Sequence, residues 1–171
     1  MSRTIVVFAA LAGVVLLGLF LVSPRMANKK GPVQPINYNH KVHIEKAGMN
    51  CTDCHAYAEK LASASIPTLE TCQNCHNDTP LSQSPEETKL LNHVAEKKEI
   101  PWARIYKLPD HVYFSHRRHV VRGKLDCAEC HGVMAELTEA VSIPAKPVTM
   151  ENCLRCHQQT NASTDCLACH R

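Results

Sequence analysis

The sequence predicts a mostly α-helical fold with much irregular loop, preceded by one N-terminal transmembrane helix. Ten cysteines stand in the 171 residues, all in short motifs of one kind. Aromatic residues make up only 5%, and much of the 44% hydrophobic fraction lies in one block near the N-terminus. The remainder therefore has little material for an ordinary core. Such chains need disulfides, metals or bound cofactors for stability, which argues against both a conventional enzyme domain and disorder.

The N-terminal block runs from Ile5 to Val22 without a charge, an 18-residue stretch. At ~1.5 Å per residue it nearly spans a hydrocarbon core of ~30 Å. The alternative is a cleaved signal peptide, whose apolar stretch is ~7–15 residues and ends in a small-x-small site. Because this run is longer and Arg25 stands at a poor place for cleavage, we expect residues 1–23 to form a retained anchor. Residues 24–35 then read as a polar linker.

Every cysteine belongs to a C-x-x-C pair followed at once by histidine. In chain order, the cysteine pairs of motifs 1 to 5 are Cys51 and Cys54, Cys72 and Cys75, Cys127 and Cys130, Cys153 and Cys156, and Cys166 and Cys169. The histidines that end these motifs, in the same order, are His55, His76, His131, His157 and His170. C-x-x-C-H is the attachment signature of c-type haem. The two thiols add to the vinyl groups of one porphyrin, and the adjacent histidine becomes the proximal iron ligand.

Three other uses of these cysteines fit less well. Zinc sites do not need a histidine after each pair, a thioredoxin-like motif is single and lies in a βαβ unit, and a disulfide scaffold would have irregular spacings. We therefore expect five covalent haem c groups. Their propionates would take the formal charge of +3 to about −2 when oxidised, so we expect no nucleic-acid partner.

The charges beside the anchor conflict with this chemistry. Arg3 precedes it, whereas Arg25, Lys29 and Lys30 follow it, which by the positive-inside rule would place the C-terminal side in the cytoplasm. Haem c is attached outside the cytoplasmic membrane, and long domains translocate largely regardless of flanking charge. We expect an inner-membrane protein with residues 36–171 forming a periplasmic pentahaem domain.

Six histidines remain as candidate distal ligands: His40, His43, His93, His111, His116 and His119. Four of them form a repeat, Tyr-x-His-x-x-His at 38–43 and Phe-x-His-x-x-His at 114–119, each followed eight residues later by a haem motif. At this spacing the two imidazoles lie on one side of a helical turn and can serve different haems.

These motifs resemble the cytochrome c3/c7 family. The resemblance implies that His40 and His116 are distal ligands for motifs 1 and 3, and that His43 and His119 reach motifs 2 and 4. The family has a distal histidine just before its penultimate motif, where this chain has Met150. We therefore expect Met150 to be the fifth distal ligand, serving motif 5 and raising its potential. Met134, His93 and His111 stay open as alternatives.

The rest of the chain divides into a two-haem half at 36–80, a bridge at 81–110 and a three-haem half at 111–171. Residues 56–64 carry good helix formers and should continue from motif 1. Residues 79–85 are rich in turn formers. The pattern of residues 86–99 predicts a helix more clearly than any other segment outside the motifs, with Leu90, Leu91 and Val94 on one side. Prolines at both ends predict an extended segment over 100–110.

The segment IPWARIYKLPDHVYFSHRRH at 100–119, with the anchor and the five motifs, resembles the pentahaem subunit of bacterial alternative complex III. The resemblance implies electron relay, without enzyme activity of its own, from a menaquinol-oxidising membrane complex to a periplasmic acceptor. Its partners would be quinol-binding membrane subunits, an iron–sulfur subunit and a monohaem cytochrome c. One alternative is a membrane-anchored quinol dehydrogenase that feeds a periplasmic reductase such as nitrite reductase. A multihaem nitrite reductase would need an iron with an open distal position, which the supply of ligands here disfavours.

Overall fold

The computed structural model describes residues 31–170. The predicted anchor at 1–23 and most of the predicted linker lie outside these residues. Within 31–170, no helix has the length and apolar composition needed to cross a membrane.

The described residues form short helices joined by long irregular segments, which confirms the expectation of a mostly helical, loop-rich fold. In chain order the helices are α2 (His40–Glu45), α3 (Cys51–Cys54), α4 (Leu69–Gln73), α5 (Pro85–Glu96), the π-helix η1 (Arg118–Arg122), α6 (Ala128–His131), the 3₁₀-helix η2 (Met134–Glu136), α7 (Met150–Gln159) and α8 (Cys166–Cys169). The only β-type pairing between 31 and 170 is an isolated antiparallel bridge between Val112 and His170.

Polar side chains just before the helices explain where several of them begin. Ser84 accepts a hydrogen bond from the amide of Glu86 at the start of α5, and Pro85 occupies its first turn. Thr149 and Asp165 accept equivalent bonds at the starts of α7 and α8. These side-chain oxygens satisfy amides that have no partner inside a helix.

Helix α5 is shorter at its C-terminus than the sequence predicted. The expected helix at 86–99 begins one residue earlier, at Pro85, and ends at Glu96. The residue that stops it is Lys97, which has a left-handed backbone with φ of 53°. Its amide donates to the carbonyls of His93 and Val94 and so closes the last turn. Leu90 is buried and Val94 packs against the same cluster, as the sequence indicated, whereas Leu91 is half-buried and is not part of this cluster.

The predicted helix at 56–64 was wrong. Helix α3 ends at Cys54, and the following residues form turns and bends as far as 62. His55 ends the helix because its backbone leaves the helical region and its ring nitrogen Nδ1 lies 3.1 Å from the carbonyl oxygen of Ser65. Ser65 itself has a positive φ of 63°. The local helix propensity of 56–64 is overridden by this return of the chain onto the motif histidine.

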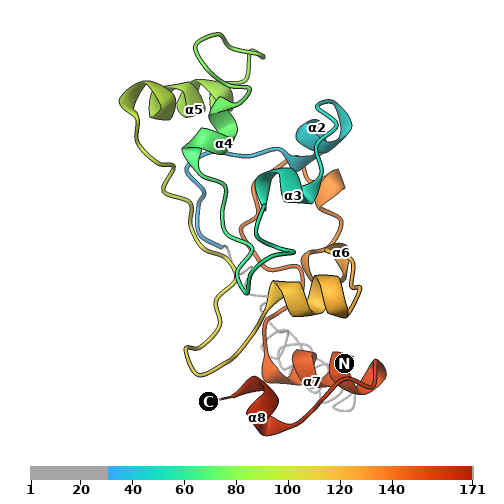
Figure 1. Ribbon diagram of the computed structural model, residues 1–171. Helices are drawn as coiled ribbons and strands as arrows, with labels where there is room; N and C mark the ends of the chain where they lie inside the picture. The colour runs from blue at the N-terminus through green and yellow to red at the C-terminus, as the bar shows by residue number, and fades with distance from the viewer. Residues whose placement is uncertain (1–30, 171) are drawn as a thin grey trace, which may run out of the picture.

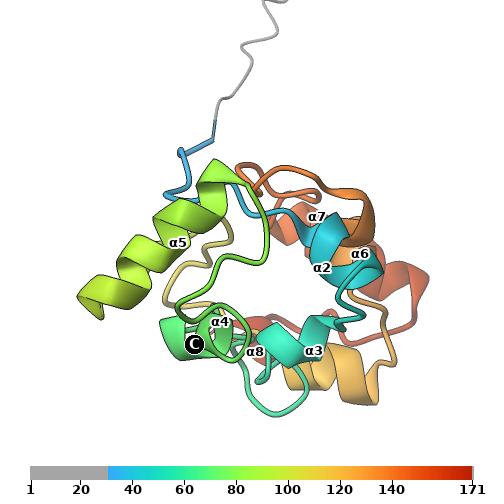
Figure 2. The same cartoon turned by 90° about the horizontal axis from the view of Figure 1, so that it is seen from above.

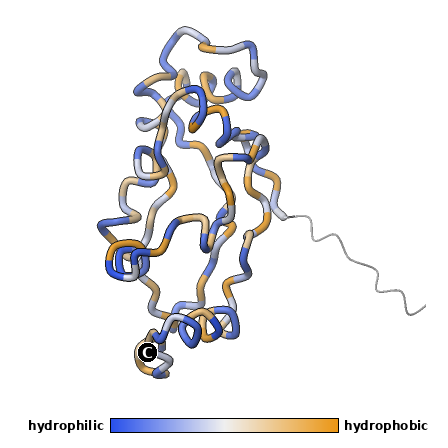
Figure 3. Tube along the Cα trace, turned by 90° about the vertical axis from the view of Figure 1, so that its right-hand side faces the viewer, coloured by the Kyte–Doolittle hydropathy of each residue, from blue (hydrophilic) through white to orange (hydrophobic). Residues whose placement is uncertain are grey.

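The helices that carry motifs follow one another along the long axis of the molecule (Figure 1). Helix α4 lies near one end beside α5, α3 and α6 lie in the middle, and α7 and α8 lie at the other end. Viewed from above, these helices lie around the periphery (Figure 2). Apolar and polar residues alternate along the chain with no continuous apolar centre (Figure 3), and no side chain among those described is fully buried. The weak core predicted from composition is therefore confirmed for these residues.

A cluster of buried apolar side chains lies at the α4–α5 end. It consists of Ile36, Leu69, Leu90 and Ile100, with Cys72, Val94 and Trp102 packed against it. This cluster joins the segment before α2, both helices and the start of the segment at 100–110, so it fixes the end of the molecule that holds motif 2.

Replacing Leu90 with alanine is expected to destabilise this end by about 2–3 kcal/mol, because the change removes buried methyl groups and leaves a cavity. Leu90 is only 9% exposed. The measurement is thermal unfolding of the full chain. The matched control is Leu81→Ala, since Leu81 is 65% exposed and its loss should change stability by no more than about 0.5 kcal/mol. Equal effects of both changes would contradict a localised core here.

Candidate haem-binding sites

Each motif is folded so that its two cysteines can reach one group. Helices α3 and α8 span the two cysteines of motifs 1 and 5, and α7 contains the whole of motif 4. Cysteines three residues apart lie on one side of a helical turn. All ten thiols are free and are therefore available for thioether bonds.

The sequence repeat is also a repeat in three dimensions. Tyr38 meets the ring of His40 edge-on at 4.7 Å between centroids and stacks on His43 at 4.4 Å. The Phe114 ring does the same, at 4.9 Å from His116 and 4.6 Å from His119. The aromatic side chain thus fixes the directions of both imidazoles, and the two halves of the chain present them in the same way.

Backbone carbonyls fix the protonation of many of these rings. Nδ1 lies within hydrogen-bonding distance of a carbonyl oxygen in His43, His55, His116, His119 and His157. A carbonyl can only accept, so Nδ1 must carry the proton, which leaves the Nε2 lone pair free to bind a metal. This is the usual outer-shell arrangement of a metal-bound histidine.

Four candidate distal histidines face the histidine of a motif. The ring centroids are 6.2 Å apart for His43 and His76, 6.3 Å for His116 and His131, 6.1 Å for His119 and His157, and 5.6 Å for His111 and His170. Two imidazoles on opposite sides of one metal ion, each bound at about 2.0–2.1 Å, have centroids about 6 Å apart. These spacings fit an iron between each pair.

His40 lies close to His55 of motif 1. Burial lowers the pKa of His40, and the neighbouring rings of His55 and His43 lower it further. His40 is therefore neutral near pH 7, which is the form that can bind a metal. Its Nδ1 is buried without a hydrogen-bond partner. Because buried polar groups in native proteins are normally paired, this nitrogen indicates that a bound group completes the site.

Met150 and His111 differ in exposure and in their contact with a motif histidine. Met150 is the first residue of α7 and is 64% exposed. His111 instead stacks on His170 of motif 5 with an angle of 20° between the rings. Two backbone contacts hold this arrangement, the bridge between Val112 and His170 and a 2.7 Å hydrogen bond from the amide of Tyr113 to the carbonyl of Cys169. The candidate for the fifth distal ligand therefore moves from Met150 to His111.

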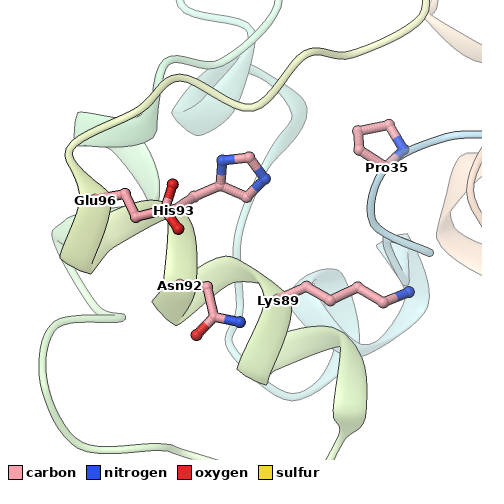
Figure 4. Close-up of a pocket in the computed structure, with 5 residues that line it drawn as sticks. All are labelled: Pro35, Lys89, Asn92, His93 and Glu96. Atoms are coloured by element: carbon pink, nitrogen blue, oxygen red, sulfur yellow. The ribbon is translucent and has the colours of Figure 1, made fainter.

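The other two open candidates lie elsewhere. Met134 is half-buried at the start of η2, which contacts α2. His93 lies on α5 and lines a solvent-open hollow with Pro35, Lys89, Asn92 and Glu96 (Figure 4). Its Nδ1 is 3.1 Å from the carbonyl oxygen of Lys98.

The motifs are not arranged in their sequence order. Burial raises the pKa of Cys72, and the thiol of Cys54 raises it further, so motif 2 adjoins motif 1. Burial and then the thiol of Cys51 raise the pKa of Cys127, which joins motif 1 to motif 3. Burial likewise raises the pKa of Cys153, with further contributions from Cys169 and Cys130, so motif 4 adjoins motifs 5 and 3. The resulting order is 2–1–3–4–5, as the helices appear along Figure 1.

Residues 36–98 and 112–171 match the family model described as "Cytochrome c7 and related cytochrome c". The chain belongs to this family. It is therefore a multihaem c-type cytochrome, which binds haem covalently and transfers electrons. The two matched segments contain all five motifs and five of the six other histidines, and His111 lies one residue before the second segment.

A curated relative of this cytochrome is known from Nitratidesulfovibrio vulgaris. It is called the multihaem cytochrome c subunit of menaquinone reductase and is 33% identical over 162 residues, covering 81% of this chain and 77% of the relative.

The sequence of this cytochrome leaves His111 as one open candidate and indicates no special partner for His76. Six free histidines for five motifs indicate a histidine as the fifth ligand, but this count does not distinguish His111 from His93. For His76, the carboxylate of Glu87 lies 2.7 Å from Nδ1. Glu87 is 11 residues away along the chain, and no spacing rule connects it to the motif.

Proposed function

We propose that this chain is the five-haem electron-relay subunit of a quinone-linked complex in the inner membrane, with its haem domain on the periplasmic side. When bound, haem c supplies a one-electron iron couple. The residues that would hold the five groups are the motif cysteines and histidines, with His40, His43, His116, His119 and His111 as distal ligands. The single observation that carries the proposal is the set of imidazole pairs about 6 Å apart.

The arrangement of the chain supports relay in place of catalysis. Each motif histidine has a second imidazole nearby, so the side chains would supply two ligands to each iron and leave no open position for a substrate. The motifs adjoin one another in one row, with motif 2 and motif 5 at its ends. Tyr38 and Phe114 each contact two histidines of one repeat. In each repeat, one histidine lies near one motif and the other lies near the next motif in the row, so each repeat would hold two adjacent haems together.

We further propose that electrons pass from menaquinol, oxidised by partner membrane subunits, through this chain to a periplasmic acceptor such as a monohaem cytochrome c. Support comes from the resemblance of residues 100–119 to the pentahaem subunit of alternative complex III. The apolar run at 5–22 supports attachment to the membrane. The quinol and an iron–sulfur centre would be held by partner subunits.

The relative's name supports a second candidate, in which the same chain delivers electrons to menaquinone. The residues described here would serve either direction, because a row of one-electron centres conducts both ways. The direction then depends on the potentials of the two terminal partners.

The test is gentle detergent extraction of the native complex, followed by identification of the subunits and assay in both directions. We expect five covalent haems in this chain by intact mass, large membrane subunits in the complex, and reduction of these haems by a menaquinol analogue. Fewer than five haems, or co-isolation with a nitrite reductase and no large membrane subunits, would overturn the proposal. Faster reduction of menaquinone by an electron-donating cytochrome than oxidation of menaquinol would favour the second candidate.

A further inference from the structure

One motif histidine has a charged partner. The Nδ1 atom of His76 lies 2.7 Å from Oε1 of Glu87, a residue of α5 that is only 7% exposed. The corresponding nitrogens of His55 and His157 face backbone carbonyls. The Glu87 contact is therefore a buried carboxylate–histidine pair at motif 2, whereas these other motifs have a neutral acceptor in the same place.

The carboxylate is held in position by the loop before α5. Oε1 also accepts a hydrogen bond from the amide of Leu81 at 2.8 Å, and Oε2 accepts from the amide and the hydroxyl of Ser82 at 2.7 and 2.5 Å. The two oxygens of Glu87 thus meet four donor groups, from His76, Leu81 and Ser82. A carboxyl group that accepts at all of these contacts is an acceptor-only carboxylate, which carries a negative charge. The donors of Leu81 and Ser82 are neutral, so they do not cancel this charge.

A buried anion at this place has a definite effect on a metal-bound imidazole. A carboxylate acceptor draws the Nδ1 proton toward itself and makes Nε2 a stronger electron donor, which favours the more highly charged state of the metal. The negative charge itself acts in the same direction through a medium of low dielectric. Both effects favour ferric over ferrous iron and so lower the reduction potential.

We propose, resting on the proposed function, that Glu87 is a positioning residue that acts through His76 and gives the group held by motif 2 the lowest reduction potential of the five. Because motif 2 is one end of the row, the row is then asymmetric, and its α4–α5 end faces the electron donor. The couple concerned adds one electron to ferric iron, with dithionite as the reductant in the titration, and the Nδ1 proton stays on His76.

The experiment is a redox titration of the full, haem-loaded chain followed by its visible spectrum. Glu87→Gln keeps the shape of the side chain and removes its charge. We expect the lowest of the five midpoint potentials to rise by the equivalent of at least a tenfold change in the one-electron equilibrium, about 59 mV, while the other four stay in place. Low-temperature electron paramagnetic resonance should show a changed low-spin signal from one iron of the five.

Two controls separate this effect from a purely structural one. Glu86→Gln removes a neighbouring charge whose partners are Lys89 and the amide of Asn37, so it should leave the lowest potential unchanged. Ser82→Ala removes one hydrogen bond between the loop and Glu87 without changing the contact of Glu87 with His76. It should therefore lower the midpoint temperature of unfolding with little change in the lowest reduction potential. An unchanged lowest potential in Glu87→Gln, with all five haems attached, would overturn the inference and leave the proposed function intact.

A further variant covers failure of maturation. If intact mass shows that Glu87→Gln lacks one haem, Glu87→Asp decides the matter, because it keeps the charge but withdraws it by one methylene. We expect Glu87→Asp to raise the lowest potential by less than the tenfold equivalent, and no rise at all would count against the inference. Absence of haem at motif 2 in the unmodified chain would instead contradict the proposed function itself.

Discussion

Replacing His111 with alanine is expected to convert one of the five proposed haem irons from six-coordinate low spin to five-coordinate high spin. The ring of His111 is 5.6 Å from that of His170 and nearly parallel to it. The backbone on both sides is tied to motif 5 by the Val112–His170 bridge and the Tyr113–Cys169 hydrogen bond. Since these ties do not depend on the imidazole, the variant should keep its fold and lose only the ligand.

The measurement is the visible and electron paramagnetic resonance spectrum of the oxidised chain, with carbon monoxide binding to the reduced chain. About one fifth of the haem should become high spin and bind carbon monoxide. The matched control is Met150→Ala, which removes an exposed side chain and should leave all five irons low spin. The unmodified chain should also lack a near-infrared thioether-to-iron band. A high-spin signal in Met150→Ala, with none in His111→Ala, would restore the methionine as the ligand.

Removing the middle motif is expected to divide the row into two parts that exchange electrons slowly. The change is Cys127→Ser together with Cys130→Ser, and its basis is the order 2–1–3–4–5. Motif 3 adjoins motif 1 through Cys127 and Cys51, and it adjoins motif 4 through Cys130 and Cys153. Because electron transfer slows steeply with the distance between centres, the loss of motif 3 should leave about half of the four remaining haems oxidised after the fast phase of reduction.

This prediction is measured by stopped-flow reduction of the purified complex with a menaquinol analogue. The control removes an end of the row in place of its middle, by Cys166→Ser together with Cys169→Ser. That variant also retains four haems, but all four should be reduced in the fast phase. Intact mass verifies the haem content of both. Complete fast reduction without motif 3 would show that the row has another order.

Features that depend on a few neighbouring residues could be read from the sequence. Covalent attachment of haem c needs two thiols and a histidine within five positions, so each C-x-x-C-H motif by itself indicates a haem-attachment site. The aromatic-x-His-x-x-His repeat is also local, since one ring contacts both imidazoles within the same turn.

Predictions that relied on propensity alone were less secure. Residues 56–64 have helix-forming side chains, but the contact between His55 and Ser65 turns the chain instead. The end of α5 depended on one left-handed residue, Lys97. In each case a specific contact or backbone state outweighs a preference of about 0.5 kcal/mol per residue.

The sequence by itself thus determined the number of C-x-x-C-H motifs, the histidine that follows each cysteine pair and the number of other histidines, because motif spacing and residue counts suffice for these. Only the tertiary structure decided which of these other histidines lies beside which motif, the order of the motifs in space, and the charged partner of His76. These depend on loops that bring distant residues together, such as 111 to 170 and 62 to 116. Irregular segments have no repeating sequence pattern. Their paths are set by tertiary contacts that form as the chain folds, and these contacts cannot be predicted from the spacing of residues along the chain.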